Sequence, residues 1–105
     1  ANNVIYDNVI GVHEEGLTRT DVTIYTHNLV HGNKTNWGAM GHPHTNDVSA
    51  NPAFVNYIRT GGGDYRLRST SPAIGKGSTT YFAPSDFLGR TRASDSELDI
   101  GAYKH

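Results

Sequence analysis

The chain has 105 residues, of which 35% are hydrophobic, and its nine Lys and Arg are nearly balanced by ten Asp and Glu. This length allows one small domain at most, and the low apolar content favours burial against a larger parent protein or a partner. The near-zero net charge excludes a chain-wide attraction to nucleic acid or to an anionic membrane, and the absence of Cys excludes disulfides and thiolate metal sites.

Two segments of the first half have the composition of β-strands. Residues 2–12 and residues 22–30 are rich in Val, Ile, Thr and Tyr, whereas twelve Gly, four Pro and no sustained period near 3.6 argue against helices. The sequence therefore predicts an all-β structure of short strands. Residues 11–21 are charged and predict a solvated loop, and residues 31–49 show no alternation and predict a long loop.

The two strand segments can be superposed at an offset of 20 residues. This offset places Asn8 on Asn28 and Val4 on Ile24, and it suits one coil of a solenoid, whose repeats usually span about 20 to 45 residues. An Asn repeated at the same place in successive coils can donate and accept hydrogen bonds along the stack. The alternative is that both Asn residues are ordinary turn residues in an Asn-rich sequence.

Five short motifs follow one another in the second half of the chain. They are Asn51-Pro52-Ala53-Phe54-Val55, Gly63-Asp64-Tyr65-Arg66-Leu67, Ser71-Pro72-Ala73-Ile74-Gly75-Lys76-Gly77, Asp86-Phe87-Leu88-Gly89-Arg90-Thr91-Arg92 and Asp99-Ile100-Gly101-Ala102-Tyr103. In this order the series resembles the C-terminal signature of bacterial right-handed parallel β-helix proteins of the pectin-lyase-like superfamily. The resemblance covers residues 51–103.

The resemblance implies an all-β fold made of the terminal coils of a right-handed parallel β-helix. Residues 1–50 would form the last coils with a long loop, and residues 51–105 would form a C-terminal capping segment. Compared with the family pattern, Gly75 and Leu88 stand where an Asp is frequent, and Lys104-His105 replaces an acid or amide. These departures place any role of those acids in doubt and leave the expected fold unchanged.

Residue properties within the motifs give further expectations. Gly89 suits a turn that needs a positive φ. Arg90 and Arg92 are expected to form ion pairs with acidic residues of the tail. Several apolar residues of the motifs are expected to turn inward. The candidate acids are Asp86, Asp95, Glu97 and Asp99. The candidate inward residues are Phe54, Leu67, Ile74, Ile100 and Ala102.

The resemblance also implies a function for the parent protein. The chain would be the C-terminal fragment of an extracellular or bacterial cell-surface protein that acts on polysaccharide, as a lyase or a glycoside hydrolase. The fragment itself would complete and cap the solenoid and be inactive alone. A non-catalytic glycan-binding or adhesive surface module and a purely structural cap are the alternatives, because the same ending accompanies different activities.

We expect the partners to be the N-terminal coils of the same β-helix or a second copy, together with polysaccharide, and neither nucleic acid nor membrane. No apolar run approaches the ~18 residues of a membrane span. The start Ala1-Asn2-Asn3 does not resemble a signal peptide, so a mature start or an excised fragment is expected.

The β-helix lyases that the chain resembles remove a proton beside a uronate carboxylate, with Arg, Lys or His as the base. On this basis His27, His31 and Lys34 are the candidate catalytic residues, because they fall on the outward side or at the exit of their strand. The alternative is that they are surface residues without a catalytic part. Trp37 and Tyr25 are the candidate glycan-binding residues, since aromatic rings stack on flat apolar faces, although Trp37 would equally serve packing.

Metal binding has weaker support. His42 and His44 are one residue apart and would form a metal pair on a strand, but Gly41 and Pro43 favour a loop, so we assign no metal ligand. The three acids Asp64, Asp86 and Asp99 suit either calcium or turn capping. We assign no cofactor to this chain and place any calcium, which the family frequently uses, in the parent protein.

Overall fold

The computed structural model describes residues 1–15, 22–92 and 98–105 of the chain. As the sequence predicts, the described residues are all-β with short strands, and no sheet among them closes on itself. None of them forms a helix of the length and hydropathy needed to cross a bilayer. The strands are β1 (Val4–Tyr6), β2 (Ile10–Val12), β3 (Tyr25–Thr26), β4 (Leu29–His31), β5 (Thr35–Trp37), β6 (His44–Thr45), β7 (Phe54–Asn56) and β8 (Asp64–Leu67).

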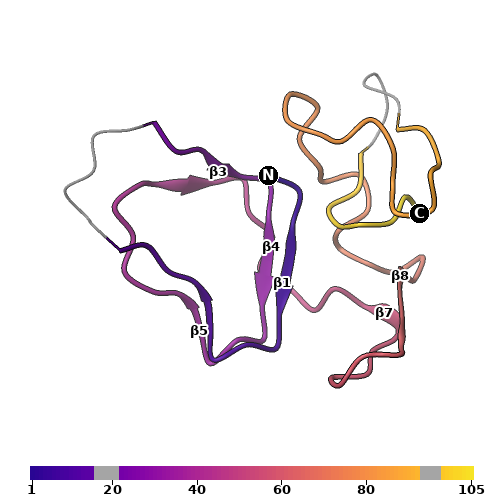
Figure 1. The fold of residues 1–105 in the computed structure, drawn as a ribbon, viewed down its shortest axis with the longest axis horizontal. Helices are drawn as coiled ribbons and strands as arrows, with labels where there is room; N and C mark the ends of the chain where they lie inside the picture. Colours follow the sequence, from indigo (N-terminus) through magenta and orange to yellow (C-terminus); the bar gives the residue numbers. More distant parts are fainter. Residues whose placement is uncertain (16–21, 93–97) are drawn as a thin grey trace.

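In the first half, each of the first three strands pairs in parallel with the strand that comes three places later. β1 pairs with β4, β2 with β5, and β3 with β6, giving three sheets of two strands each. Figure 1 shows that β1 and β4 lie side by side and that the paired strands of the first half lie along a three-sided path. Segments far apart in sequence are thus brought into direct backbone contact.

The register of these pairs differs from the predicted one. Val4 lies opposite Leu29, an offset of 25 residues, and Tyr25 lies opposite His44, an offset of 19. The expected superposition of Asn8 on Asn28 is therefore wrong. Asn8 lies beside Asn33, whose Oδ1 accepts its backbone N–H at 2.8 Å.

Sharp corners separate the strands and explain the changed register. The two segments predicted as continuous strands are broken at Asp7 and His27, which adopt φ of 62° and 52° and are each followed by an Asn. Gly32 precedes Asn33 in the same way with φ of 67°. A left-handed residue bends an extended chain, and the neighbouring Asn caps the bent backbone. Nδ2 of Asn8, for example, donates to the carbonyl oxygen of Tyr6 at 3.1 Å.

The segment 31–49 is also more regular than predicted, because it contains β5 and β6. Their ladder partners are β2 and β3, which lie about 20 residues away or more in sequence and leave no local alternation to detect. Strand formation in this segment is decided by pairing rather than by its own composition.

The second half begins with the antiparallel hairpin of β7 and β8, in which Phe54 lies opposite Leu67. It continues as a series of turns that lie beside the β1 and β4 strands in Figure 1. The buried core forms where these turns and the hairpin meet that sheet. Its members are Leu29, Leu67, Ala73 and Ile100, with Val4, Val48, Phe54 and Ile74 packed against them. The assignment of residues 51–105 as a capping segment stays a prediction.

Several expectations for the second half can be compared with the structure. Leu67 and Ile100 are buried and Phe54 and Ile74 pack on the core as predicted, but Ala102 is exposed, so its prediction as an inward residue is wrong. Ala102 lies in a turn rather than in an alternating strand, and no pleat directs its side chain inward.

Some of the interactions predicted for the C-terminal tail are present in the structure. Gly89 has φ of 79°, and Arg90 pairs with Asp86 at 2.7 Å, both as predicted. Arg92 contacts neither Asp86 nor Asp99 as an ion pair, and Asp95 and Glu97 lie outside the described residues.

Candidate functional site

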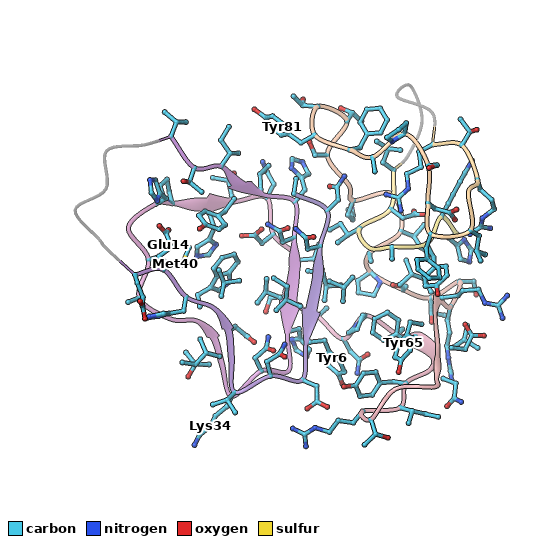
Figure 2. The ribbon with its side chains drawn as sticks, viewed as in Figure 1. Tyr6, Glu14, Lys34, Met40, Tyr65 and Tyr81 are labelled. Carbon is cyan, nitrogen blue, oxygen red and sulfur yellow. The ribbon has the colours of Figure 1, made fainter. Side chains whose placement is uncertain are left out.

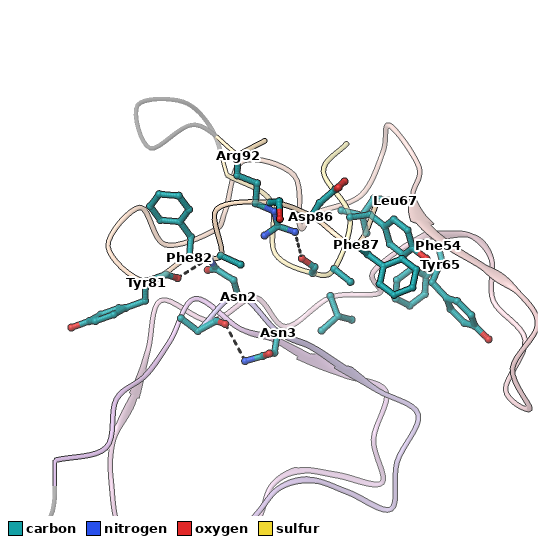
Figure 3. Close-up of a pocket in the computed structure, with 17 residues that line it drawn as sticks. Asn2, Asn3, Phe54, Tyr65, Leu67, Tyr81, Phe82, Asp86, Phe87 and Arg92 are labelled. Atoms are coloured by element: carbon teal, nitrogen blue, oxygen red, sulfur yellow. Dashed lines mark hydrogen bonds between the residues drawn. The ribbon is translucent and has the colours of Figure 1, made fainter. Parts of the chain in front are cut away.

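The structure has a cleft of about 840 Å³ between the start of the chain and the second half. This volume falls within the range of about 300 to 1,000 Å³ that is usual for ligand sites. Figure 3 shows the cleft with its lining side chains. They are Ala1, Asn2, Asn3, Val4, Phe54, Tyr65, Leu67, Tyr81, Phe82, Ala83, Ser85, Asp86, Phe87, Arg92, Gly101, Ala102 and Tyr103.

Asn2 joins the two sides of the cleft. Its φ is 60°, its Oδ1 accepts the backbone N–H of Ser78 at 2.6 Å, and its Nδ2 donates to the carbonyl oxygen of Tyr81 at 3.0 Å. The backbone N–H of Gly101 donates to the carbonyl oxygen of Asn2 at 2.9 Å. The side chain of Asn2 is buried, so these bonds fix the wall of the cleft at the beginning of the first strand.

Aromatic rings are the main apolar component of the cleft. Phe87 packs edge to face on Tyr103 with ring centroids 5.4 Å apart, and Phe54 packs in the same manner on Tyr65 at 5.8 Å. Phe87 is nevertheless 73% exposed and Tyr81 is 47% exposed. The cleft therefore presents ring faces to solvent, which is the surface needed to stack against a flat ligand.

Asp86 is the acid of the cleft, and its carboxylate is fully engaged. Oδ1 accepts the backbone N–H groups of Leu88 at 2.9 Å and Arg90 at 2.8 Å, and Oδ2 accepts that of Lys104 at 3.0 Å and the Nε of Arg90 at 2.8 Å. Burial by itself would raise the pKa of Asp86, but these bonds and the Arg90 charge hold the pKa well below its ordinary value. Asp86 thus stays ionised and serves the structure rather than proton transfer.

Arg92 is the arginine that lines the cleft, and it is buried, with 8% of its surface exposed. Its Nη2 donates to the carbonyl oxygen of Gly101 at 2.7 Å, while its buried Nε has no hydrogen-bond partner. Among the ion pairs formed by the described residues, none involves Arg92. A positive charge with an unused donor therefore lines the cleft.

The predicted catalytic residues do not converge on this cleft. His27 lies at the corner before β4, where its Nδ1 contacts Oγ1 of Thr26 at 2.7 Å, and it lines a smaller depression together with Asp47 and Lys76. His31 ends β4, and Lys34 is exposed before β5. The structure thus places His27 before the short strand β4 and His31 at its end, and their catalytic role stays a prediction.

The predicted glycan-binding residues do lie together. Tyr25 and Trp37 pack edge to face with ring centroids 6.5 Å apart. One face of the Trp37 indole is covered by the imidazole of His44, which stacks on it at 3.6 Å and 4°. This contact supports the packing alternative for Trp37, and the role of both rings in glycan binding stays a prediction.

His42 and His44 each contact a different carboxylate. Nδ1 of His42 lies 2.7 Å from Oε2 of Glu14, and Nδ1 of His44 lies 2.7 Å from Oδ2 of Asp47. Burial would raise the pKa of Glu14, but the hydrogen bonds and charge of His42 lower it. In Figure 2, Glu14 lies within the three-sided path of the ribbon. In the described part of the chain, no three His, Asp or Glu side chains gather closely enough to hold a metal ion.

The acids considered for calcium cap the backbone instead. Oδ1 of Asp99 accepts the N–H of Gly75 at 2.9 Å, and Oδ2 accepts that of His105 at 2.6 Å. Asp64 binds the backbone and side chain of Arg66, which lowers its pKa to about 2. These contacts agree with the turn-capping alternative.

Sequence reasoning did not find the cleft. Its walls combine residues 1–4 with residues of the β7–β8 hairpin and with residues from 81–92 and 101–103, and no spacing in the sequence indicates that these segments meet. Aromatic residues are frequent in the tail motifs, and among them the sequence predicts a position for Phe54 alone, as an inward residue.

Comparison of the chain with family models, with curated proteins and with solved structures finds no match. The function is therefore argued from the geometry above.

Proposed function

We propose that the chain is the C-terminal part of an extracellular β-helix protein that acts on polysaccharide, and that it completes the terminal coils of the solenoid. The observation that supports this best is the parallel pairing of each of the first three strands with the strand three places later. Parallel strands joined by corners on a three-sided path are the arrangement in which solenoid coils stack. The right-handed sense and the capping role of residues 51–105 belong to the same proposal.

The exposed side of the first three strands supports the proposal that a further protein segment docks there. Among the described residues, β1, β2 and β3 each form a ladder with one strand. Val9 is 69% exposed and Val22 is 89% exposed beside these strands. Strand edges next to exposed apolar side chains are the surface that a further coil would cover. We propose that this coil comes from an N-terminal portion of the same protein or from a second copy.

In this proposal the parent cleaves polysaccharide as a lyase or a glycoside hydrolase, and His27, His31 and Lys34 are its candidates in this region. Most of the catalytic residues, and any calcium, would belong to the parent upstream. A lyase base must reach the proton beside the sugar carboxylate, which His27 at an open corner would allow more readily than a buried residue.

The aromatic cleft favours the second candidate, a non-catalytic glycan-binding or adhesive module. Exposed rings provide stacking surfaces, whereas the acid of the cleft, Asp86, is held ionised by four donors and is unsuited to proton transfer. Under this alternative the chain binds sugar without cleaving it.

One experiment compares the chain and the full parent against a panel of acidic and neutral polysaccharides. Cleavage by the parent alone supports the first candidate, and binding without cleavage by either supports the second. The variant His27→Ala is then measured in the parent beside the control His105→Ala, which changes an exposed residue at the last position. Unchanged turnover in folded His27→Ala would remove His27 from the catalytic candidates.

A further inference from the structure

We infer that the cleft binds a small, uncharged aromatic molecule, which packs against two pairs of aromatic rings from separate parts of the chain. One pair is Phe54 and Tyr65, on β7 and β8. The other pair is Phe87 and Tyr103, in the C-terminal segment. The inference goes beyond the proposed function, because neither the cleavage of polysaccharide nor the binding of sugar requires an aromatic ligand.

The two ring pairs both line the cleft but do not pack on each other. The centroids of Phe54 and Tyr65 are 5.8 Å apart in an edge-to-face arrangement. Those of Phe87 and Tyr103 are 5.4 Å apart in the same arrangement. In the described part of the chain, no ring of one pair contacts a ring of the other. Figure 3 shows Phe54, Tyr65 and Phe87 toward the same end of the cleft, so an aromatic molecule that enters there meets rings from both pairs.

Phe87 is held in an exposed position by the turn that carries it. Oδ1 of Asp86 accepts the backbone N–H groups of Leu88 and Arg90. The N–H of Phe87 itself donates to the carbonyl oxygen of Ala102 at 2.7 Å. The ring is nevertheless 73% exposed, and a large apolar side chain exposed beside a cleft is typical of a binding site. Because the turn is already ordered, a ligand that covers the ring does not have to order it.

The charged residues of the lining favour a ligand without charge. The side chain of Asp86 is wholly buried, and its oxygens already accept hydrogen bonds from the C-terminal turns. Arg92 is 8% exposed, its Nε is buried, and its Nη2 donates to the carbonyl oxygen of Gly101. A charged ligand would therefore lose water from its charge and find no carboxylate and no free Nε to replace it, which is costly.

The rest of the lining supplies neutral polar groups. Tyr81 and Ser85 are exposed residues of the cleft, and each carries a hydroxyl group. Hydroxyl groups both donate and accept hydrogen bonds, so they suit a ligand with a hydroxyl group of its own. A flat molecule of two fused aromatic rings with one hydroxyl group combines these properties.

The direct test titrates related ligands into the chain by calorimetry at pH 7. The flat, uncharged 2-naphthol is compared with its saturated counterpart 2-decalol and with the anion 2-naphthoate. We expect 2-naphthol to bind about tenfold more tightly than either, because 2-decalol lacks aromatic faces and 2-naphthoate must bury an unpaired charge. No binding of 2-naphthol, or equal affinity for 2-naphthol and either of the other two, would overturn the inference.

Variants then locate the bound ligand. Phe87→Ala should weaken the binding of 2-naphthol about tenfold, whereas Phe87→Tyr should retain it. Leu88→Ala is the matched control, because Leu88 is a 57% exposed apolar residue of the same turn that does not line the cleft. The emission of Trp37, which lies outside the cleft, checks that each variant is folded. Unchanged binding in folded Phe87→Ala, or an equal loss in Leu88→Ala, would contradict the assignment.

Two further measurements exclude other occupants of the cleft. If the chain sediments as a dimer and Phe87→Ala as a monomer, a second copy covers Phe87 and the inference is wrong. If a neutral galactose hexamer binds, loses affinity in Phe87→Ala, and 2-naphthol does not bind, the cleft is a sugar site and the inference is again wrong. Cleavage of polysaccharide by the parent tests the proposed function separately, so the failure of one can be told from the failure of the other.

Discussion

The side-chain oxygen of Asn28 accepts two hydrogen bonds from Asn3, one from its backbone N–H at 3.1 Å and one from its Nδ2 at 3.0 Å. The backbone N–H of Asn28 in turn donates to Oδ1 of Asp47 at 3.1 Å. Three corners of the chain, 25 and 19 residues apart, are thus joined by polar side chains. These hydrogen bonds link successive passes of the chain at corners that lie outside the strands.

Replacement of Asn28 by Ala should destabilise the protein by about 1 to 3 kcal/mol, the usual cost of leaving buried polar groups without a partner. Asn28 is 4% exposed, so water cannot easily replace the lost acceptor for Asn3. Urea unfolding measures the effect. Asn56→Ala is the control, because Asn56 is exposed on β7, and its loss should change stability by less than about 0.5 kcal/mol. Equal stability of the two variants would contradict the role of Asn28.

Asp86 should make the stability of the protein depend on acid pH. Although burial opposes ionisation, the donors from Lys104 and Arg90 depress its folded pKa, so the ionised form stabilises the fold above the ordinary Asp pKa of about 3.9. This contribution is lost as the pH falls from about 4 toward the folded pKa. Asp86→Asn should therefore be less stable than the wild type at pH 7, with a gap that narrows below about pH 4.

Thermal unfolding over this pH range tests the prediction, with Asp64→Asn as the control. The Asp64 pair with Arg66 is local and more exposed, so its loss should affect stability less. A gap between Asp86→Asn and the wild type that stays constant down to the lowest pH would count against the depressed pKa.

Tyr57 should titrate above the ordinary tyrosine pKa of about 10. Its hydroxyl donates to Oδ2 of Asp7 at 2.7 Å, and this bond, together with burial and the Asp7 charge, raises the pKa of Tyr57 to about 12. The stability from this contact is complete below the ordinary pKa of about 10 and is lost as the pH rises toward 12. An ultraviolet titration of the protein should show a tyrosine step delayed toward pH 12. Asp7→Asn should shift that step downward, and Asp64→Asn should not.

His44 should determine the emission of Trp37. The imidazole covers one face of the indole at 3.6 Å, and Trp37 is the only tryptophan, so its fluorescence reports on the surroundings of this ring. His44→Ala should expose the indole to water and shift its emission to longer wavelength. His105→Ala, at the exposed end of the chain, should leave the spectrum unchanged. An unshifted spectrum in His44→Ala would show that the two rings do not stack in solution.

Some of the candidate sites could be anticipated from local sequence and others could not. The capping of turns by Asp64 and Asp86 followed from the Asp residues within turn motifs, because these contacts involve neighbours a few residues away. The contact of His42 with Glu14 joins residues that are 28 positions apart, and the side chain of Asn2 at the cleft donates to the carbonyl oxygens of Ser78 and Tyr81. No local property of these residues specifies which distant segment they meet.

The sequence by itself determined that the protein is all-β, with strands built from Val, Ile, Thr and Tyr and ended by Asn, Asp and Gly. It also indicated the buried positions Leu67 and Ile100, because side-chain hydrophobicity is a local property. Only the tertiary structure decided the offset of 25 residues between β1 and β4 and the placement of Arg92 in the cleft. Register depends on where left-handed corners fall and which backbone edges meet, and these are fixed by pairing energies summed over the whole fold.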